Sequence, residues 1–417
     1  MVMRIALLTG GGDSSAINAA IRAVVRRALA AGHEVIGIKR GWRGLIYDEV
    51  EPLFMGSVSG IIQRGGTILG TSRTNPFKVE NGLENIMVNL RKHGIEAIIA
   101  IGGDDTNGVA HRLAEYGVKC VGIPQTIDND LPLPGGAPTF GFNTARHLGF
   151  QLLQNIMEDS RSMNRWYFVA VMGRSAGHLA LGIGKAAGAT LVLIPEEFGP
   201  RVSLEAVCDV LEGAMLKRRV MGRQDGVAVI AEGILERVPE EELARLEGVR
   251  IVRDPYGHIR LAELDLAYIL KSMVEARFAR RGDPVTIVHK SLGYELRCAP
   301  PVASDSEYVR DLGFGAVEFL LGDHPGSGAL ICRDGDQLRF VDFRELLDPE
   351  TGRPRTRLVD IHSTSYRVAR KYMIRLEPQD FEDPEQLRRL AEAAKTTPEE
   401  FRRRYRHAAE LPATTGT

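Results

Sequence analysis

Short apolar runs alternate with stretches of helical periodicity along most of the chain. Runs of five or six residues that are rich in Val, Ile and Ala predict buried strands, and the amphipathic stretches between them predict helices. The predicted strands are Arg4 to Thr9, Glu34 to Lys39, Ala97 to Ile101, Val118 to Ile123, Tyr167 to Met172, Thr190 to Ile194, Gly226 to Ala231 and Pro284 to Val288. The predicted helices are Ser15 to Ala31, Glu80 to His93, Asp105 to Tyr116, Thr144 to Asp159, Ala176 to Ala187, Ser203 to Lys217 and Leu261 to Arg280.

This alternation indicates α/β architecture, because parallel strands need helical crossovers that cover both faces of the sheet. A chain of 417 residues with 44% hydrophobic content is long enough for more than one lobe. We therefore predict two Rossmann-like, three-layer α/β/α lobes with mostly parallel sheets. After about residue 345 the chain becomes turn-rich and then densely charged with helical spacing, which predicts a peripheral, mostly helical C-terminal extension.

Charge and cysteine content narrow the possible partners. The chain has 53 basic and 54 acidic residues, so its net charge favours neither a nucleic acid nor a membrane surface. Its four cysteines show no CxxC spacing, which is typical of buried thiols in a reduced compartment and not of a zinc site. The N-terminal run lacks the features of a signal peptide, and no stretch is long and apolar enough to span a membrane, so we expect a cytoplasmic protein.

A glycine-rich turn follows the first predicted strand, at Thr9-Gly10-Gly11-Gly12-Asp13. Glycines let the backbone approach a ligand closely, and the start of the next helix offers amides that suit a phosphate. Such turns can also be merely tight connections, and this one lacks the spacing and the lysine of Walker A.

A second turn, Gly102-Gly103-Asp104-Asp105-Thr106, also joins a strand to a helix. Asp104 is a candidate for a Mg²⁺ ion shared with phosphate oxygens. The alternative is that Asp104 or Asp105 caps the helix, since Asp is a preferred N-cap. A cap would explain one aspartate but not both of them together with two glycines.

The third turn, Pro124 to Leu131, contains Thr126-Ile127-Asp128-Asn129-Asp130. In an extended segment, alternate residues share one face, so Asp128 and Asp130 would lie side by side. One carboxylate can then act as a base while the other orients a metal ion or water. A solvated acidic turn is the alternative. Because the three turns all follow strands, we expect a phosphoryl-transfer site at the carboxyl ends of one sheet.

In their order along the chain, five motifs resemble those of the phosphofructokinase family: Gly11-Gly12-Asp13, Gly102 to Thr106, Pro124 to Asp130, Met172 to Gly177, and Leu292 to Arg297. The resemblance spans roughly residues 3 to 345. It implies transfer of a phosphoryl group to the 1-hydroxyl of fructose 6-phosphate with Mg²⁺. It also implies a donor lobe of residues 1–140 and about 298–345, a sugar-phosphate lobe of residues 141–297, and an extension of residues 346–417.

The resemblance assigns roles residue by residue. Asp128 resembles the general base, flanked by Thr126 and Asp130, and Arg73 resembles the cation over the transferring group. On the donor side it implies contacts from Gly11, Gly103, Asp104, Asp105 and Gln125, with Asp104 as the metal contact. For the sugar phosphate it implies Met172, Gly173, Arg174 and Glu232, with Tyr294 and Arg297 at the 6-phosphate.

Arg165 matches the arginine that the family usually contributes across a subunit boundary to the 6-phosphate, so the resemblance implies a homodimer or homotetramer. The neighbouring Trp166 and Tyr167 are typical of an interface. A plain surface charge is the alternative for Arg165.

Two positions bear on the phosphoryl donor. Members that use ATP generally have glycine where this chain has Asp105, and pyrophosphate-dependent members resemble this chain there. A carboxylate would repel a nucleotide's α-phosphate, since two like charges about 4 Å apart cost on the order of 4 kcal/mol at an effective dielectric near 20. Gln125 matches neither the lysine typical of pyrophosphate-dependent members nor the glycine typical of ATP-dependent ones. We expect its bulk to obstruct an α-phosphate, and we predict pyrophosphate as the donor.

Two other enzymes and one noncatalytic protein compete with this reading. An ATP-dependent kinase of the same fold differs at Asp105 and Gln125. A noncatalytic sugar-phosphate sensor would have no need of a base at Asp128. A dinucleotide oxidoreductase is disfavoured, because the glycines lack GxGxxG spacing.

Overall fold

The computed structural model describes residues 2–246, 264–324, 328–350 and 355–412. The chain forms two compact units, each assembled from two separate stretches. Unit 1 comprises Met1–His147 and Tyr294–Arg357, and unit 2 comprises Leu148–Gly293 and Leu358–Thr417. The functional lobes predicted from the sequence stay a prediction. Their boundaries lie near these divisions, but the end of the chain belongs to unit 2 by its contacts.

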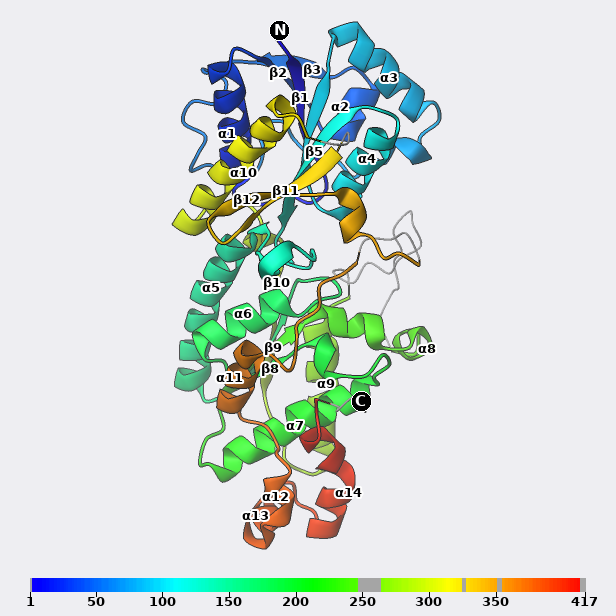
Figure 1. Ribbon diagram of the computed structural model, residues 1–417. Helices are drawn as coiled ribbons and strands as arrows, with labels where there is room; N and C mark the ends of the chain where they lie inside the picture. Colours follow the sequence, from blue (N-terminus) through cyan, green and yellow to red (C-terminus); the bar gives the residue numbers. More distant parts are fainter. Residues whose placement is uncertain (1, 247–263, 325–327, 351–354, 413–417) are drawn as a thin grey trace. The chain divides into compact units, whose positions relative to one another are not determined.

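Unit 1 contains an eight-stranded sheet in the order β12-β11-β5-β4-β1-β2-β3, with β6 paired to β5 (Figure 1). Its inner strands run parallel, whereas β3 and β12 are antiparallel to their neighbours β2 and β11. The strands are β1 (Arg4–Thr9), β2 (Glu34–Ile38), β3 (Val50–Leu53), β4 (Ala97–Gly102), β5 (Lys119–Thr126), β6 (Phe140–Gly141), β11 (Gly328–Asp334) and β12 (Gln337–Val341).

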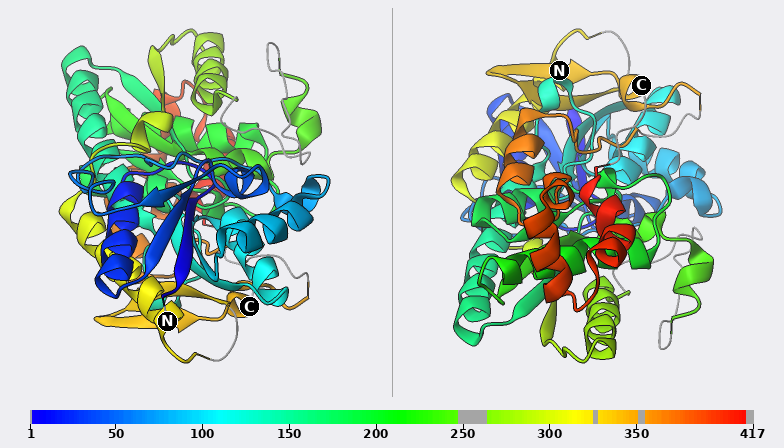
Figure 2. Two further views of the ribbon diagram at one scale, coloured as in Figure 1. Left: turned by 90° about the horizontal axis from the view of Figure 1, so that it is seen from above. Right: turned by 90° about the horizontal axis from the view of Figure 1, so that it is seen from below.

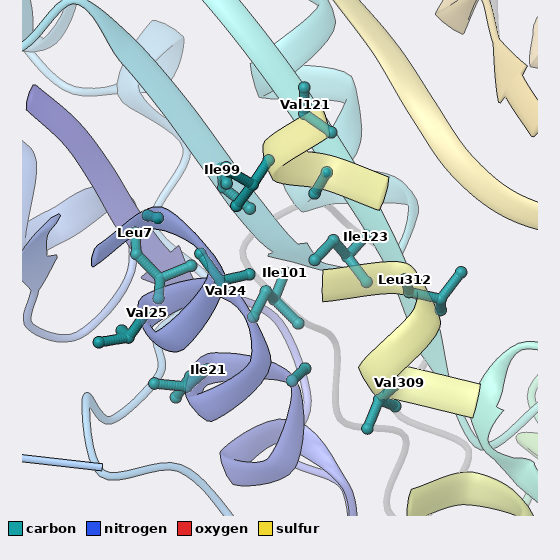
Figure 3. Packing of buried hydrophobic residues seen from close by; sticks show 14 of the residues in the cluster. Leu7, Ile21, Val24, Val25, Ile99, Ile101, Val121, Ile123, Val309 and Leu312 are labelled. Atoms are coloured by element: carbon teal, nitrogen blue, oxygen red, sulfur yellow. The ribbon is translucent and has the colours of Figure 1, made fainter. Parts of the chain in front are cut away.

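Alternate residues of the inner strands enter two different cores, one on each face of this sheet. Ile5 and Leu7 of β1 pack with α1 (Ile17–Ala30) and α10 (Ala303–Leu321). Ala6 and Leu8 face the other layer. That layer is made of α2 (Trp42–Ile46), α3 (Gly82–His93) and α4 (Asp104–Glu115). Figure 3 shows the first core, where Ile21, Val24 and Val25 of α1 meet Ile99 and Ile101 of β4. Burying each such side chain contributes about 1.5–3 kcal/mol.

Unit 2 contains a four-stranded sheet in the order β10-β7-β9-β8, and all its pairings are parallel. Its strands are β7 (Trp166–Val171), β8 (Leu191–Leu193), β9 (Gly226–Ala231) and β10 (Ile287–Leu292). The accompanying helices are α6 (His178–Ala187), α7 (Leu204–Val220), α8 (Glu240–Leu243) and α9 (Leu266–Arg280). Helix α5 (Phe142–Met163) begins in unit 1 and continues into unit 2, where a Cβ at Gly149 would come within 2.3 Å of Ile183 of α6.

The C-terminal segment is helical and belongs to the body of unit 2. Its helices are α11 (Thr364–Tyr372), α12 (Gln379–Glu382), α13 (Pro384–Ala393) and α14 (Pro398–Ala409), and α13 and α14 pack on α7 (Figure 2). Phe381 and Phe401 are fully buried, and buried Arg375 and Tyr366 both contact the carboxylate of Glu197, at 3.1 and 2.6 Å. The helical prediction is confirmed, but these helices are not peripheral.

The helix starts follow local chemistry. Ser203, Asp265, Ser363, Asp383 and Thr397 are N-caps of α7, α9, α11, α13 and α14, and each side chain accepts a backbone N–H of the first turn. Short 3-10 helices fill several connections: η1 (Pro76–Lys78), η2 (Pro134–Gly136), η3 (Pro195–Glu197), η4 (Glu232–Arg237), η6 (Tyr294–Leu296) and η7 (Phe343–Leu346).

The predicted α/β class with two mostly parallel sheets is confirmed, and most predicted strands and helices lie within a few residues of the observed ones. The strand predicted at Pro284 to Val288 is shifted, because β10 begins at Ile287. The start of the helix predicted at Leu261 to Arg280 falls partly outside the described residues. Among the residues described, no helix has both the length and the apolar character to cross a membrane.

Candidate active site

Three glycine- or acid-containing turns of unit 1 follow adjacent parallel strands. Strand β4 lies between β1 and β5, with Thr9 opposite Ile101 and Gly102 opposite Pro124. The carboxyl ends of β1, β4 and β5 therefore meet at one edge of the sheet. The turns that begin at Gly10, Gly103 and Ile127 continue from that edge, which is where ligands bind in open parallel sheets.

The first turn requires glycine at positions 10 and 11, because neighbouring atoms lie too close for a side chain at the first and the backbone is left-handed at the second. A Cβ at Gly10 would lie 2.7 Å from Oγ1 of Thr106, and Gly11 has φ +85°. The Gly10 amide donates to the Ile101 carbonyl at 2.9 Å, and the Gly11 amide donates to the Ser72 carbonyl at 3.0 Å. The Gly11 amide that we predicted to bind phosphate is thus engaged within the chain. The same bond ties the segment carrying exposed Arg73 to this turn.

Asp104 and Asp105 occupy the first turn of α4, and Gly103 is its N-cap. The alternative that one of these aspartates merely caps the helix is therefore wrong. Both carboxylates lie where the unpaired amides and the positive end of the helix dipole favour negative charge. Asp104 is partly exposed and Asp105 is exposed, so both can meet solvent or a ligand.

The third turn departs from the extended geometry that we assumed. Asn129 has φ +58°, which turns the chain between the two aspartates, so Asp128 is partly exposed whereas Asp130 is buried. The Asp128 amide donates to Oγ1 of Thr126 at 3.1 Å. The expectation that Asp128 and Asp130 share one face of an extended segment is wrong.

Gln125 and Asp105, the two positions that bear on donor choice, differ in exposure. Gln125 lies in β5 and is 3% exposed, whereas Asp105 is an exposed residue of α4. The predicted obstruction of an α-phosphate by the bulk of Gln125 is not supported by this burial. The carboxylate of Asp105 is exposed and can therefore act on a bound donor.

In unit 2, parallel pairing brings together four residues predicted to bind the sugar. Val171 at the end of β7 is opposite Ala231 at the end of β9, so Met172 and Glu232 follow neighbouring strand ends. Oε1 of Glu232 accepts the amides of Gly173 and Arg174, both at 3.1 Å. Met172 and Gly173 are buried, whereas Arg174 is exposed.

Arg165 directly precedes β7 and is held by residues of its own unit. Its guanidinium donates to Asp159 Oδ2 at 2.7 Å and to the Tyr167 hydroxyl at 3.0 Å. The hydrogen bonds from Tyr167 and Arg165 lower the pKa of Asp159. Trp166 and Tyr167 are 3% and 9% exposed. Since these two aromatic residues are buried within unit 2, they are no indication of an interface.

Tyr294 and Arg297 belong to unit 1. Tyr294 is exposed in η6. Nη1 of Arg297 donates to the Asp13 carbonyl at 3.2 Å and lies 2.7 Å from a Cβ built on Gly12. The main-chain carbonyl of Arg297 accepts the Ser15 hydroxyl at 3.0 Å. The arginine that we predicted at the sugar 6-phosphate thus lies against the first glycine turn. Cys298 beside it is exposed, unlike the other three cysteines, which are buried as expected.

The donor set suits a magnesium ion that is bound together with phosphate. Across the described ranges, no group of three or more His, Cys, Asp or Glu side chains could hold a metal alone. Mg²⁺ is usually held by one or two carboxylates, several waters and substrate phosphates. Asp104, at the start of a helix and on the same sheet edge as the Asp128 turn, fits that requirement.

Residues 4–320 match the sequence model of the family described as phosphofructokinase. The chain belongs to the phosphofructokinase family. It is 52% identical to a pyrophosphate–fructose 6-phosphate 1-phosphotransferase of Thermotoga maritima, over 99% of this chain and 100% of that protein. It is 43% identical to a protein of the same name from Naegleria fowleri, over 97% and 96% of the two chains. A Thermus thermophilus protein named ATP-dependent 6-phosphofructokinase 1 is 40% identical, over 83% and 94%.

Solved phosphofructokinase structures share the fold. A pyrophosphate-dependent phosphofructokinase from Marinobacter aquaeolei has a TM-score of 0.66 at 19% identity, with 95% of this chain and 92% of that chain covered. The chain covers only 50% of the Saccharomyces cerevisiae phosphofructokinase chain, with a TM-score of 0.64 at 23% identity. At these identities the likeness concerns the fold alone.

Sequence reasoning missed the residues that shape the third turn of this phosphofructokinase. Thr139 donates its amide to Asn129 Oδ1 at 3.1 Å and its hydroxyl to the Thr126 carbonyl at 2.7 Å. Arg357 contacts Asn129, Asp130 and Ala137 from far along the chain. Asn between two aspartates after a strand was a usable signal, because Asn tolerates the left-handed region. Arg357 carries no local signal.

Proposed function

We propose that this phosphofructokinase transfers a phosphoryl group from pyrophosphate to the 1-hydroxyl of fructose 6-phosphate. The observation that carries the proposal is the meeting of the β1, β4 and β5 ends, which brings the glycine turn, Asp104 and Asp128 to one sheet edge. The names of the two full-length relatives support the same substrates. The product would be fructose 1,6-bisphosphate.

In the proposed reaction, the Asp128 carboxylate accepts the proton of the sugar 1-hydroxyl. The sugar oxygen forms a bond to the terminal phosphorus of pyrophosphate as the bond from that phosphorus to the bridging oxygen breaks, and orthophosphate leaves. Thr126 orders the turn through its bond to the Asp128 amide. Asp130 flanks the base, and Arg73 is the cation proposed to neutralise the transferring group.

Asp104 is proposed to hold Mg²⁺, which would neutralise charge on the phosphate oxygens. Gly11 and Gly103 leave room for the donor, because neither has a side chain. On the sugar side we propose Met172, Gly173, Arg174 and Glu232, with Tyr294 and Arg297 at the 6-phosphate. Arg165 is proposed to act across a subunit boundary in a homodimer or homotetramer, which requires it to leave Asp159. A cytoplasmic location suits these glycolytic substrates.

The choice of donor depends chiefly on Asp105. A carboxylate there, exposed in the first turn of α4, repels any further phosphate group beside a bound pyrophosphate. ATP is the second candidate donor, because Gln125 is buried and does not contribute to that exclusion. The name of the Thermus relative, which is called ATP-dependent, also supports ATP as the second candidate.

The decisive experiment compares the initial rates of fructose 6-phosphate phosphorylation with pyrophosphate and with ATP. We expect pyrophosphate to be faster, and we expect Asp105→Gly to move the ratio of kcat/KM values towards ATP by at least about tenfold. Asp105→Asn is the matched control, since it keeps the size of the side chain and removes its charge. If Asn moves the ratio as far as Gly does, repulsion accounts for donor choice; if only Gly does, bulk accounts for it.

The donor proposal would be overturned if the unmodified protein used ATP as the phosphoryl donor and did not use pyrophosphate. Absence of turnover with both donors and Mg²⁺ would overturn the proposed activity itself.

A further inference from the structure

The chain returns to the Asp128 turn after β12, at Arg357. This residue is the last of unit 1 and lies beyond residues 4–320, which match the family model. Its backbone amide donates to the Asp130 carbonyl at 2.6 Å. Its side chain reaches the same turn, so main chain and side chain hold it together.

The guanidinium of Arg357 joins two separate segments of unit 1. Nε and Nη2 donate to the Asn129 carbonyl at 3.1 and 2.7 Å, and Nη2 also contacts Asn129 Oδ1. Nη1 donates to the Ala137 carbonyl at 3.0 Å. Only arginine offers several N–H donors in one rigid plane, whereas lysine presents a single compact charge. The site is therefore specific for arginine.

These contacts are made to the residue that sets the direction of the turn. Asn129 has φ +58°, a conformation that a side chain other than Gly, Asn or Asp rarely adopts. Its carbonyl and its side-chain oxygen are both engaged, the first by Arg357 and the second by Arg357 and the Thr139 amide. Since Asp128 directly precedes Asn129, the contacts that hold Asn129 in this conformation also restrain the peptide bond that follows Asp128.

The charge of Arg357 also acts on the acidic turn. Burial lowers the pKa of Arg357, and the opposing influences come from Asp130 and from Tyr308 of α10. Burial raises the pKa of Tyr308 to about 12, so this phenol stays neutral in the pH range of an assay. Of the two influences that oppose the lowering of the Arg357 pKa, the charge of Asp130 is the larger, and Asp130 belongs to the turn itself.

We propose that Arg357 is a positioning residue for the phosphoryl-transfer base: it fixes Asn129 in the left-handed conformation and thereby aims Asp128. The inference rests on the proposed function. It assigns to the segment after β12 a part in catalysis that the family match does not contain.

The test is the kinetics of Arg357→Ala with saturating pyrophosphate and Mg²⁺. We expect kcat to fall at least about thirtyfold while KM for both substrates stays within about threefold. The reason is that the base loses its orientation whereas the residues proposed to bind the substrates are unchanged. The acid limb of the kcat–pH profile should move to higher pH, since removal of a cation raises the pKa of nearby carboxylates. Added guanidinium ion should restore part of the activity.

Arg355→Ala is the matched control. Arg355 lies two residues away in the same segment, is exposed and donates to the Glu345 carbonyl, so its removal should leave kcat within about twofold. Arg357→Lys keeps a partly buried cation and the aliphatic stem but cannot bridge Asn129 and Ala137. It should remain as slow as Arg357→Ala within about threefold and should not respond to guanidinium.

Arg357→Ala with kcat within threefold of the unmodified enzyme would overturn the proposal, as would a loss confined to KM or full activity in Arg357→Lys. If Arg357→Ala does not fold, Arg357→Lys decides: a kcat that is lower by at least about thirtyfold supports the proposal, and full activity overturns it. These outcomes presuppose an active parent enzyme; an inactive parent contradicts the proposed function instead.

Discussion

The two units hold their candidate site residues in different ways. In unit 1, the Asp128 turn is held by Thr126, Thr139 and Arg357 through groups other than the Asp128 carboxylate. In unit 2, the Gly173–Arg174 turn is held by the carboxylate of Glu232, which is itself proposed to bind the sugar. Neighbouring residues thus support the turn of the proposed base in unit 1, whereas in unit 2 a side chain that is proposed to bind the sugar itself supports the turn.

The difference predicts how substitutions will behave. A change of the proposed base should lower turnover more than stability, because Thr126, Thr139 and Arg357 hold the turn through its main chain and through Asn129. A change of Glu232 should alter stability and substrate binding together, since two backbone amides lose their acceptor.

The largest effect is expected for Asp128→Ser. Loss of a general base should lower kcat at least about a hundredfold, while the affinity for fructose 6-phosphate measured by calorimetry and the unfolding temperature stay near those of the parent. The bond from the residue-128 amide to Thr126 survives the substitution. Asp336→Ser, in the exposed turn between β11 and β12, is the control and should be silent. Near-normal turnover in Asp128→Ser would remove Asp128 from its proposed role.

A smaller, double effect is expected for Glu232→Ala. Leaving the amides of Gly173 and Arg174 without this acceptor should cost about 1–3 kcal/mol, and KM for fructose 6-phosphate should rise at least about tenfold. Differential scanning calorimetry and steady-state kinetics measure the two quantities.

Glu232→Gln separates the two roles of this side chain. Its amide oxygen can still accept both backbone donors, so the unfolding temperature should recover. KM should remain raised, because the charged acceptor for sugar hydroxyls is gone. Recovery of both quantities would show that Glu232 only supports the turn.

The smallest effect concerns the attachment of the C-terminal helices to unit 2. Nε2 of His407 in α14 lies 3.3 Å from the carboxylate of Asp209 in α7. The same carboxylate forms ion pairs with Arg277 at 2.8 Å and with Arg404 at 3.6 Å. The hydrogen bond to Asp209 raises the pKa of His407. A raised pKa means that the folded state binds the proton more tightly, so the stabilisation is complete below the ordinary value of about 6.5 and is lost as pH rises through the folded-state pKa.

His407→Gln should therefore lower the unfolding temperature at pH 5.5 but not at pH 8.5. His407 is about half exposed, so solvent screening limits the effect to less than about 1 kcal/mol. His362→Gln, an exposed histidine before α11, serves as the control. An equal loss at both pH values would show that packing, not charge, attaches α14.

Periodicity and motif order were sufficient to predict the two parallel sheets and the three turns of unit 1. The runs from Arg4 and Gly226 match β1 and β9 residue for residue, because buried parallel strands are apolar throughout. Strands β3, β6, β11 and β12 escaped prediction. For β3 and β12 the reason is that their burial is partial and their apolar signal is weak.

The site was harder to predict where the decisive contacts are long-range. Asp104, Asp128 and Glu232 stand at strand ends, which local sequence reveals. The bond from Gly11 to Ser72, the burial of Gln125 and the reach of Arg357 to Asn129 depend on packing between distant segments. No local pattern encodes them.

Because each unit is made of two stretches, the chain passes from one unit to the other three times, after His147, Gly293 and Arg357. Neither unit can be inherited, recombined or expressed as one continuous block. A fragment that stops at residue 320 would retain every residue that we predicted to bind substrate or metal. It would lack strands β11 and β12 and helices α11 to α14. The part of this protein that matches the family model is therefore shorter than the part that makes up the two compact units.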